Sequence, residues 1–290
     1  MIVVTGATGQ LGRLVIKALL KTESASEIIA AVRSPEKAAD LATLGVQVRR
    51  ADYNEPSTLD TAFKGADKLL LISSNELGRR AVQHRATIDA AKRSGVKLIG
   101  YTSVLHADTS PLGLAGEHRE TEEALRASGV PFVLLRNGWY TENYTSSLAP
   151  ALEHGAILGS AGDGKIASAA RADYAEAAAR AMTRDAQAGR VYELAGDTAY
   201  TLADLAAEVT RQSGKTVEYR NLSEADYKAA LIEVGLPEVV AALLSDSDTG
   251  ASKGALFDEG HQLSQLLGRP TTPLATVVAE SARGVIAGFL

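Results

Sequence analysis

The stretch Val3-Val4-Thr5-Gly6-Ala7-Thr8-Gly9-Gln10-Leu11-Gly12 joins a short apolar run to a helical pattern at the start of the chain. Its three glycines suit a tight turn, close approach of the backbone to a phosphate, and close packing of helix on strand. Glycines also occur in ordinary turns, but strand, loop and helix follow one another here in the order that is typical of a dinucleotide-binding site. The first amides of a helix attract anions. We therefore expect the diphosphate of a dinucleotide at Gly6, Ala7, Thr8, Gly9, Gln10 and Leu11.

The alternation of short apolar runs and helical patterns continues over the first 140 residues. Six runs rich in Val, Ile and Leu are candidate strands, at residues 2–4, 28–32, 46–49, 68–72, 98–101 and 132–135. Most show no in/out alternation, which is typical of strands covered on both faces. Helical patterns occur between them at 11–20, 57–63, 79–94 and 116–128. This order predicts an α/β fold built on a doubly wound parallel Rossmann sheet.

The pattern changes after Arg136. Asp173 and Glu176 have the spacing of a capping box before an Ala-rich helix. Strands are expected at 191–194 and 217–219 around a helix at 202–213, with further helical stretches at 224–234, 237–244 and 274–287. We predict a dinucleotide-binding Rossmann domain over 1–140, with returning segments around 160–195. A smaller, interleaved α+β domain over 141–290 would cover the substrate.

Composition excludes several classes of protein. The 290 residues carry 30 Lys and Arg against 35 Asp and Glu, and the net charge of −5 disfavours a nucleic-acid partner. The absence of cysteine excludes disulfides and thiolate chemistry, and the five histidines show no metal-ligand spacing, so we predict no metal site. The N-terminus does not resemble a signal peptide, and no apolar run approaches the roughly 18 residues of a membrane helix. We expect a cytoplasmic protein; a homodimer is compatible with the sequence.

The residue that ends the second predicted strand indicates which cofactor is used. An NAD site usually carries Asp or Glu there, to bind the ribose 2′-hydroxyl. This chain has Ala30-Ala31-Val32-Arg33-Ser34. The Arg33 guanidinium cannot accept those hydrogen bonds but suits a 2′-phosphate. We therefore predict NADP(H), with a solvated surface arginine as the alternative.

Polar residues also follow the fourth, fifth and sixth predicted strands. Ser73, Ser74 and Asn75 follow the fourth, Thr102-Ser103 follows the fifth, and Arg136-Asn137-Gly138-Trp139-Tyr140-Thr141-Glu142-Asn143 follows the sixth. Ligands of such sheets bind at the carboxyl ends of the strands, where the strand order reverses. Trp139 and Tyr140 could form a wall for a flat ligand. The alternative is a packed aromatic pair at the start of a helix.

Together with 161–168 and 246–254, these segments resemble the NmrA-like family of atypical short-chain dehydrogenases over nearly the whole chain. The resemblance implies NADPH binding, two-electron reduction of quinones, and no flavin. It also fits the regulators of this family, which sense the dinucleotide and do not catalyse a reaction. By the resemblance, the cofactor contacts beyond the glycine loop are Arg33, Ser73, Ser74, Asn75, Asn137, Gly138, Trp139, Tyr140, Thr141, Glu142 and Arg171.

The acid–base pair of typical short-chain dehydrogenases is missing. Leu114 occupies the position of their tyrosine and His118 that of their lysine, and we expect His118 to pair with Glu122 at the surface of a helix. This favours a substrate that accepts a hydride with little help, such as a quinone. No catalytic residue is assigned with certainty. The candidate quinone contacts are Asn75, His84, Tyr140 and Asn143, with a partly buried, hydrogen-bonded helix histidine as the alternative for His84.

Overall fold

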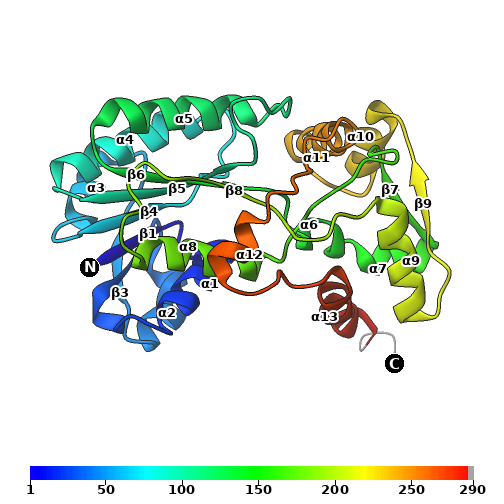
Figure 1. Cartoon of the computed structure of the whole chain (residues 1–290), viewed down its shortest axis with the longest axis horizontal. Helices are drawn as coiled ribbons and strands as arrows, with labels where there is room; N and C mark the ends of the chain where they lie inside the picture. Colours follow the sequence, from blue (N-terminus) through cyan, green and yellow to red (C-terminus); the bar gives the residue numbers. More distant parts are fainter. Residues whose placement is uncertain (287–290) are drawn as a thin grey trace.

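We describe a computed structural model of the chain, which covers residues 1–286 and the side chains of residues 1–283. A seven-stranded sheet with helices on both faces packs beside a second group of helices and a small two-stranded sheet (Figure 1). The predicted end of the last helix, at residue 287, lies outside the described residues. No helix within them combines the length and apolarity needed to cross a membrane.

All seven strands of the large sheet are parallel, in the order β3-β2-β1-β4-β5-β6-β8. The order reverses between β1 and β4, so the carboxyl ends of these two neighbours open a crevice. The predicted α/β Rossmann architecture is confirmed. The strands are β1 Ile2–Thr5, β2 Ile28–Val32, β3 Gln47–Arg50, β4 Lys68–Leu71, β5 Leu98–Val104, β6 Phe132–Asn137 and β8 Val191–Leu194.

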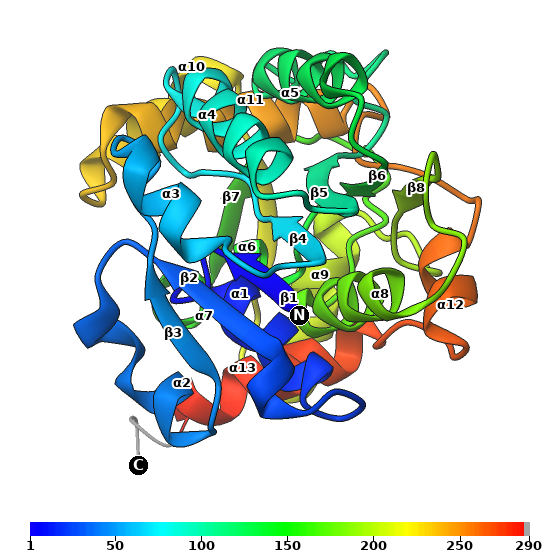
Figure 2. The same cartoon turned by 90° about the vertical axis from the view of Figure 1, so that its left-hand side faces the viewer.

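Helices cover the sheet on both faces (Figures 1 and 2). Because successive side chains of a strand point to opposite faces, Val3 packs with α3, α4 and α5, while Ile2 and Val4 pack with α1, α8 and α12. The helices of the first face are α3 Pro56–Ala62, α4 Arg80–Arg93 and α5 Ala115–Ser128. Those of the second are α1 Gln10–Leu19, α2 Ala39–Thr43, α8 Arg171–Thr183 and α12 Gln262–Leu267.

The remaining elements form a separate hydrophobic cluster that includes Trp139, Leu202 and Leu256. The predicted strand at 217–219 is present as β9, which pairs with a strand that the sequence did not indicate, β7. The predicted strand at 191–194 joins the large sheet instead, beside β6. The elements are β7 Ala156–Gly159, β9 Glu218–Asn221, α6 Glu142–Thr145, α7 Leu148–His154, α9 Leu202–Ser213, α10 Glu224–Glu233, α11 Glu238–Ala251 and α13 Leu274–Ile286.

The predicted capping box at Asp173 is wrong. Helix α8 begins at Arg171, so Asp173 lies within its first turn. The Asp173 carboxylate binds Arg269 Nη2 at 2.8 Å and the Thr272 amide at 2.7 Å, which ties the segment after α12 to α8. The Glu142 carboxylate accepts the Arg171 amide at 2.9 Å instead. A partner from outside the local sequence thus replaces the expected cap.

Helix α11 carries a buried carboxylate, Asp248, which is 2% exposed. One of its oxygens accepts the Ser160 amide at 3.1 Å, and the other accepts the Tyr144 hydroxyl at 3.0 Å. Burial outweighs these bonds and raises the pKa of Asp248 to about 6. The folded state therefore holds this proton more tightly than the unfolded chain does.

Stability should consequently decline as the pH rises from about 4 to about 6, where Asp248 ionises in the folded protein. We expect Asp248→Asn to remove this decline and to raise the free energy of unfolding at pH 8 by about 1–3 kcal/mol. Urea denaturation across this pH range measures both effects. Asp246→Asn is the matched control, because Asp246 is only partly buried on the same helix and binds the Gly113 amide. An unchanged pH profile in Asp248→Asn would contradict the assignment.

Candidate cofactor-binding site

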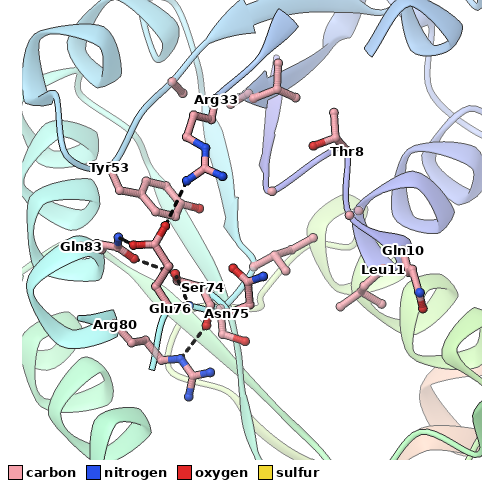
Figure 3. Close-up of a pocket in the computed structure, with 18 of the residues that line it drawn as sticks. Thr8, Gln10, Leu11, Arg33, Tyr53, Ser74, Asn75, Glu76, Arg80 and Gln83 are labelled. Atoms are coloured by element: carbon pink, nitrogen blue, oxygen red, sulfur yellow. Dashed lines mark hydrogen bonds and ion pairs between the residues drawn. The ribbon is translucent and has the colours of Figure 1, made fainter. Parts of the chain in front are cut away.

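A cavity of about 540 Å³ opens at the carboxyl ends of β1 to β4 (Figure 3). Its size is typical of small-molecule and cofactor sites. Four loops build its wall, one after each of these strands, and Tyr140 and Arg171 complete it. The lining residues are Gly6, Thr8, Gly9, Gln10, Leu11, Gly12, Ala31, Val32, Arg33, Ala51, Asp52, Tyr53, Asn54, Ile72, Ser73, Ser74, Asn75, Glu76, Arg80, Gln83, Tyr140 and Arg171.

The glycine loop has the geometry that the sequence predicts for a phosphate. Gly6 has a φ of +58°, which favours glycine, and its carbonyl accepts the Gly9 amide at 2.9 Å. Gly9 is the N-cap of α1, and no side chain caps this helix end. A Cβ added to Gly12 would lie 2.7 Å from Ala7 Cα and against the Gly6 carbonyl. The loop is thus folded tightly on a helix whose first amides are free for an anion.

Arg33 directly follows β2 and lines the part of the cavity beside that strand. Its side chain is 67% exposed, and its Nη1 binds Glu76 Oε1 at 3.0 Å (Figure 3). Gln83 Nε2 binds the other carboxylate oxygen of Glu76 at 2.7 Å. The guanidinium therefore faces the cavity, where it could reach a phosphate.

The segment after β4 is held by hydrogen bonds from side chains of α4. The Ser74 amide donates to His84 Nε2 at 2.9 Å, the Ser74 hydroxyl donates to Gln83 Oε1 at 2.6 Å, and Arg80 Nε donates to the Ser74 carbonyl at 2.8 Å. These three bonds fix the backbone of Ser74, while the Asn75 side chain remains exposed at the cavity.

The structure corrects the interpretation of His84 as a quinone contact. The ring is fully buried, and its Nδ1 lies 3.0 Å from Thr121 Oγ1. Burial and the charge of Arg80 lower the pKa of His84 to about 3, so the imidazole is neutral. Because Nε2 accepts the Ser74 amide, Nδ1 carries the proton and donates to Thr121. No ring nitrogen is left for a ligand, and His84 instead positions Ser74.

Tyr140, which follows β6 and lines the cavity, is contacted by three side chains. The Arg171 guanidinium lies over its ring, 4.7 Å from the centroid, and Tyr174 packs edge-on with ring centroids 5.2 Å apart. Asn137 Nδ2 approaches the Tyr140 hydroxyl at 3.5 Å. Burial raises the pKa of Tyr140, so the phenol is protonated at neutral pH. It can therefore donate a hydrogen bond into the cavity.

Several other predicted contacts have side chains that do not line the cavity. Trp139 belongs to the hydrophobic cluster with Leu202, so the expected wall of two aromatics is reduced to Tyr140. The Thr141 hydroxyl is 2.8 Å from Ser168 Oγ, and Asn143 Oδ1 accepts from Arg171 Nη2 at 3.4 Å. The residues placed outside the lining are Ala7, His84, Asn137, Gly138, Trp139, Thr141, Glu142 and Asn143.

His118 also differs from the prediction. It is buried and does not pair with Glu122 at the surface. Its Nδ1 lies 2.7 Å from the Tyr101 hydroxyl and its Nε2 lies 3.2 Å from Arg80 Nη1. Burial and the Arg80 charge hold the pKa of His118 well below its ordinary value. The ring thus supports Arg80, and Glu122 pairs with Arg136.

Apart from Gly12, Ala31, Val32 and Ile72, which belong to the predicted glycine stretch and strands, two groups of lining residues were not predicted. The segment 51–54 follows β3 directly, so its place at a carboxyl strand end was the available signal. Glu76, Arg80 and Gln83 belong to the turn and helix after β4. Nothing in their local sequence distinguishes them from a solvated helix start. Among the residues that the structure describes, no cluster of His, Asp and Glu could hold a metal ion.

Comparison with known proteins identifies the family. The model of the NmrA-like family matches residues 1–265. The chain belongs to the NmrA-like family. This NmrA-like protein is 62% identical to quinone oxidoreductase 2 of Escherichia coli K12 over 279 residues, which cover 96% of this chain and 98% of that protein.

Two solved structures share the fold over nearly the whole chain. A crystal structure of the E. coli NADPH-dependent quinone oxidoreductase QOR2 in complex with NADPH is 61% identical, with a TM-score of 0.95 over 97% of this chain and 99% of that chain. Triphenylmethane reductase of Citrobacter sp., complexed with NADP(H), is 39% identical, with a TM-score of 0.93 over 97% of this chain and 100% of that chain.

Proposed function

We propose that this NmrA-like protein is an NADPH-dependent quinone oxidoreductase that works by direct hydride transfer without a flavin. The observation that carries the proposal is one continuous cavity with a phosphate-binding helix start, the Arg33 guanidinium, and the Tyr140 phenol along its wall. The 62% identity to a quinone oxidoreductase over nearly the full length of both chains supports the same activity.

The residues that would hold the dinucleotide lie along the wall of the cavity. The loop from Gly6 to Leu11 would hold the diphosphate through backbone amides, and Arg33 the 2′-phosphate. Ser73, Ser74 and Asn75 would hold the middle of the cofactor, and Tyr140 and Arg171 the nicotinamide end. Asn137 and Glu142 would act indirectly, since they bind Tyr140 and the Arg171 amide. The backbone of Ala7 would shape the glycine loop, and the backbone of Gly138, Trp139 and Thr141 would shape the loop after β6.

The chemistry that we propose requires little acid–base help from the protein. When bound, the cofactor supplies a hydride, and one proton from solvent completes the reduction of a quinone to a hydroquinone. The chain would hold both rings in contact and stabilise negative charge on the quinone oxygen. Tyr140 and Asn75 line the cavity and carry hydrogen-bond donors, so we assign them this role. The missing tyrosine–lysine pair, replaced here by Leu114 and His118, agrees with such a substrate.

The test is to mix the purified protein with NADPH and a simple benzoquinone and to follow the nicotinamide absorbance. We expect the absorbance to fall faster than without enzyme, and the denatured protein to release no flavin fluorescence. Tight NADPH binding without turnover would instead favour a dinucleotide sensor. Flavin released in stoichiometric amount would contradict direct hydride transfer.

Arg33→Ala tests the cofactor preference. A charge-assisted contact to a phosphate is worth about 1.5–3 kcal/mol, so the Kd for NADPH should rise about 10- to 150-fold while the Kd for NADH changes little. Fluorescence titration of both nucleotides measures the two constants. Arg50→Ala is the matched control, because Arg50 also pairs with a glutamate, Glu55, but does not line the cavity. An equal loss for NADPH and NADH would refute the role of Arg33.

A further inference from the structure

Glu76 pairs with Arg33, the residue proposed to bind the nucleotide 2′-phosphate. Its Oε1 lies 3.0 Å from Arg33 Nη1, and both residues line the cavity (Figure 3). Arg33 directly follows β2 and Glu76 belongs to the segment after β4, so their pair bridges the two walls of the crevice. In this structure Arg33 therefore pairs with a carboxylate of the same chain.

The Glu76 carboxylate is held in place by a buried chain of hydrogen bonds. Gln83 Nε2 donates to Glu76 Oε2 at 2.7 Å, and the Gln83 side chain is only 2% exposed. Gln83 Oε1 accepts the Ser74 hydroxyl at 2.6 Å, which itself accepts the Glu76 amide at 3.2 Å. Arg79 Nη1 lies farther away, 3.7 Å from Oε2. The carboxylate therefore does not depend on Arg33 for its position.

A fixed carboxylate at this place affects two kinds of nucleotide differently. A 2′-phosphate must displace Glu76 from Arg33 and then lie beside a like charge, which weakens its binding. A ribose with a free 2′-hydroxyl brings no charge, and its hydroxyl can donate to the carboxylate. Arg33 favours the phosphate, and Glu76 opposes it.

We propose that Glu76 is a specificity-determining residue that limits the preference of this cleft for nucleotides with a 2′-phosphate. The inference rests on the proposed use of NADPH. It concerns binding at the adenosine end of the cavity and does not depend on the hydride acceptor.

Calorimetry with 2′,5′-ADP and 5′-AMP tests the inference, because these probes differ only in the 2′-phosphate and lack the nicotinamide. Glu76→Gln should bind 2′,5′-ADP roughly three- to tenfold more tightly, since release of an exposed ion pair and removal of a like charge both contribute. Its Kd for 5′-AMP should stay within about twofold or rise. In the Arg33→Ala background the gain should be smaller, because only the like charge is then removed. Glu208→Gln is the matched control, since Glu208 pairs with Arg211 on α9, outside the cavity.

Four results would overturn the inference. If Glu76→Gln weakens the binding of 2′,5′-ADP but not of 5′-AMP, the carboxylate orients Arg33 for the phosphate. Equal weakening for both probes would mean that Glu76 only supports the Ser74 segment. If the unaltered protein shows no preference for 2′,5′-ADP, the proposed use of NADPH fails, and this inference fails with it. A clear preference that Glu76→Gln leaves unchanged would refute the inference alone.

Discussion

Gly12→Ala should bind NADPH roughly a hundredfold more weakly than the unaltered protein and should unfold at a lower temperature. The added Cβ would lie 2.7 Å from Ala7 Cα and against the Gly6 carbonyl. Both neighbours are backbone groups, so they cannot rotate away as the end of a side chain could. Helix α1 must therefore move away from the loop. A displacement of about 1 Å at a positioning element can cost about two orders of magnitude in function, and overpacking costs about 1–3 kcal/mol of stability.

NADPH titration and thermal unfolding measure the two effects of Gly12→Ala. Gly116→Ala is the control, because Gly116 lies in helix α5 and its added Cβ meets only Arg119 Nη2, at 4.0 Å. Alanine there should keep NADPH affinity and raise stability by up to about 1 kcal/mol. Unchanged affinity in Gly12→Ala would show that the loop is not closely packed on α1.

Arg136→Met should lower the free energy of unfolding by about 3–5 kcal/mol. Arg136, on β6, is buried and binds Glu122 through two hydrogen bonds of 2.9 and 2.8 Å, and its Nη1 binds Glu193 at 2.7 Å. Burial opposes ionisation of Glu122, but bonds from Arg136 and Ser103 hold the pKa of this carboxyl below its ordinary value. Without the Arg136 guanidinium, the buried Glu122 carboxylate would keep only the half-exposed Arg126 as a counter-charge.

Urea denaturation of Arg136→Met measures this loss. Arg126→Met is the matched control, because Arg126 binds the same Glu122 carboxylate at 3.1 Å from a side chain that is 48% exposed. An exposed ion pair contributes about 0–1 kcal/mol, so this control should be nearly as stable as the unaltered protein. Similar losses in both variants would contradict a special role for the buried pair. Adding Glu122→Gln to Arg136→Met should recover part of the stability.

The Rossmann half of the fold was predictable because its signals are local. Strand β4 lies at the centre of a parallel sheet, so Leu69, Leu70 and Leu71 are buried on both faces and form a continuously apolar run. The C-terminal part was less predictable. Strand β7, Ala156–Gly159, has an exposed Leu158 and a glycine, so its sequence lacks the features of a buried strand. Its pairing with β9 depends on a partner about 60 residues away.

The candidate site shows the same division. The glycine loop, Arg33 and the segment 73–75 line the cavity as expected, because each directly follows a predicted strand. The roles of His118 and Asp173 were missed, because their partners lie on other elements, and for His84 the sequence left the quinone contact and the hydrogen-bonded helix histidine both open. A polar residue in a helix has the same local pattern whether it meets water or a buried partner. Only packing distinguishes the two cases.

The sequence by itself thus determined the strands and helices of the Rossmann half, the glycine loop and the cation beside it. These features follow from hydrophobic periodicity, glycine conformation and residue charge, which act over a few neighbouring residues. Only the tertiary structure decided that His84 is a neutral support for Ser74 and that Glu76 binds Arg33. Arg33 and Glu76 are 43 residues apart, and they meet because β1 and β4 are neighbours in the folded sheet.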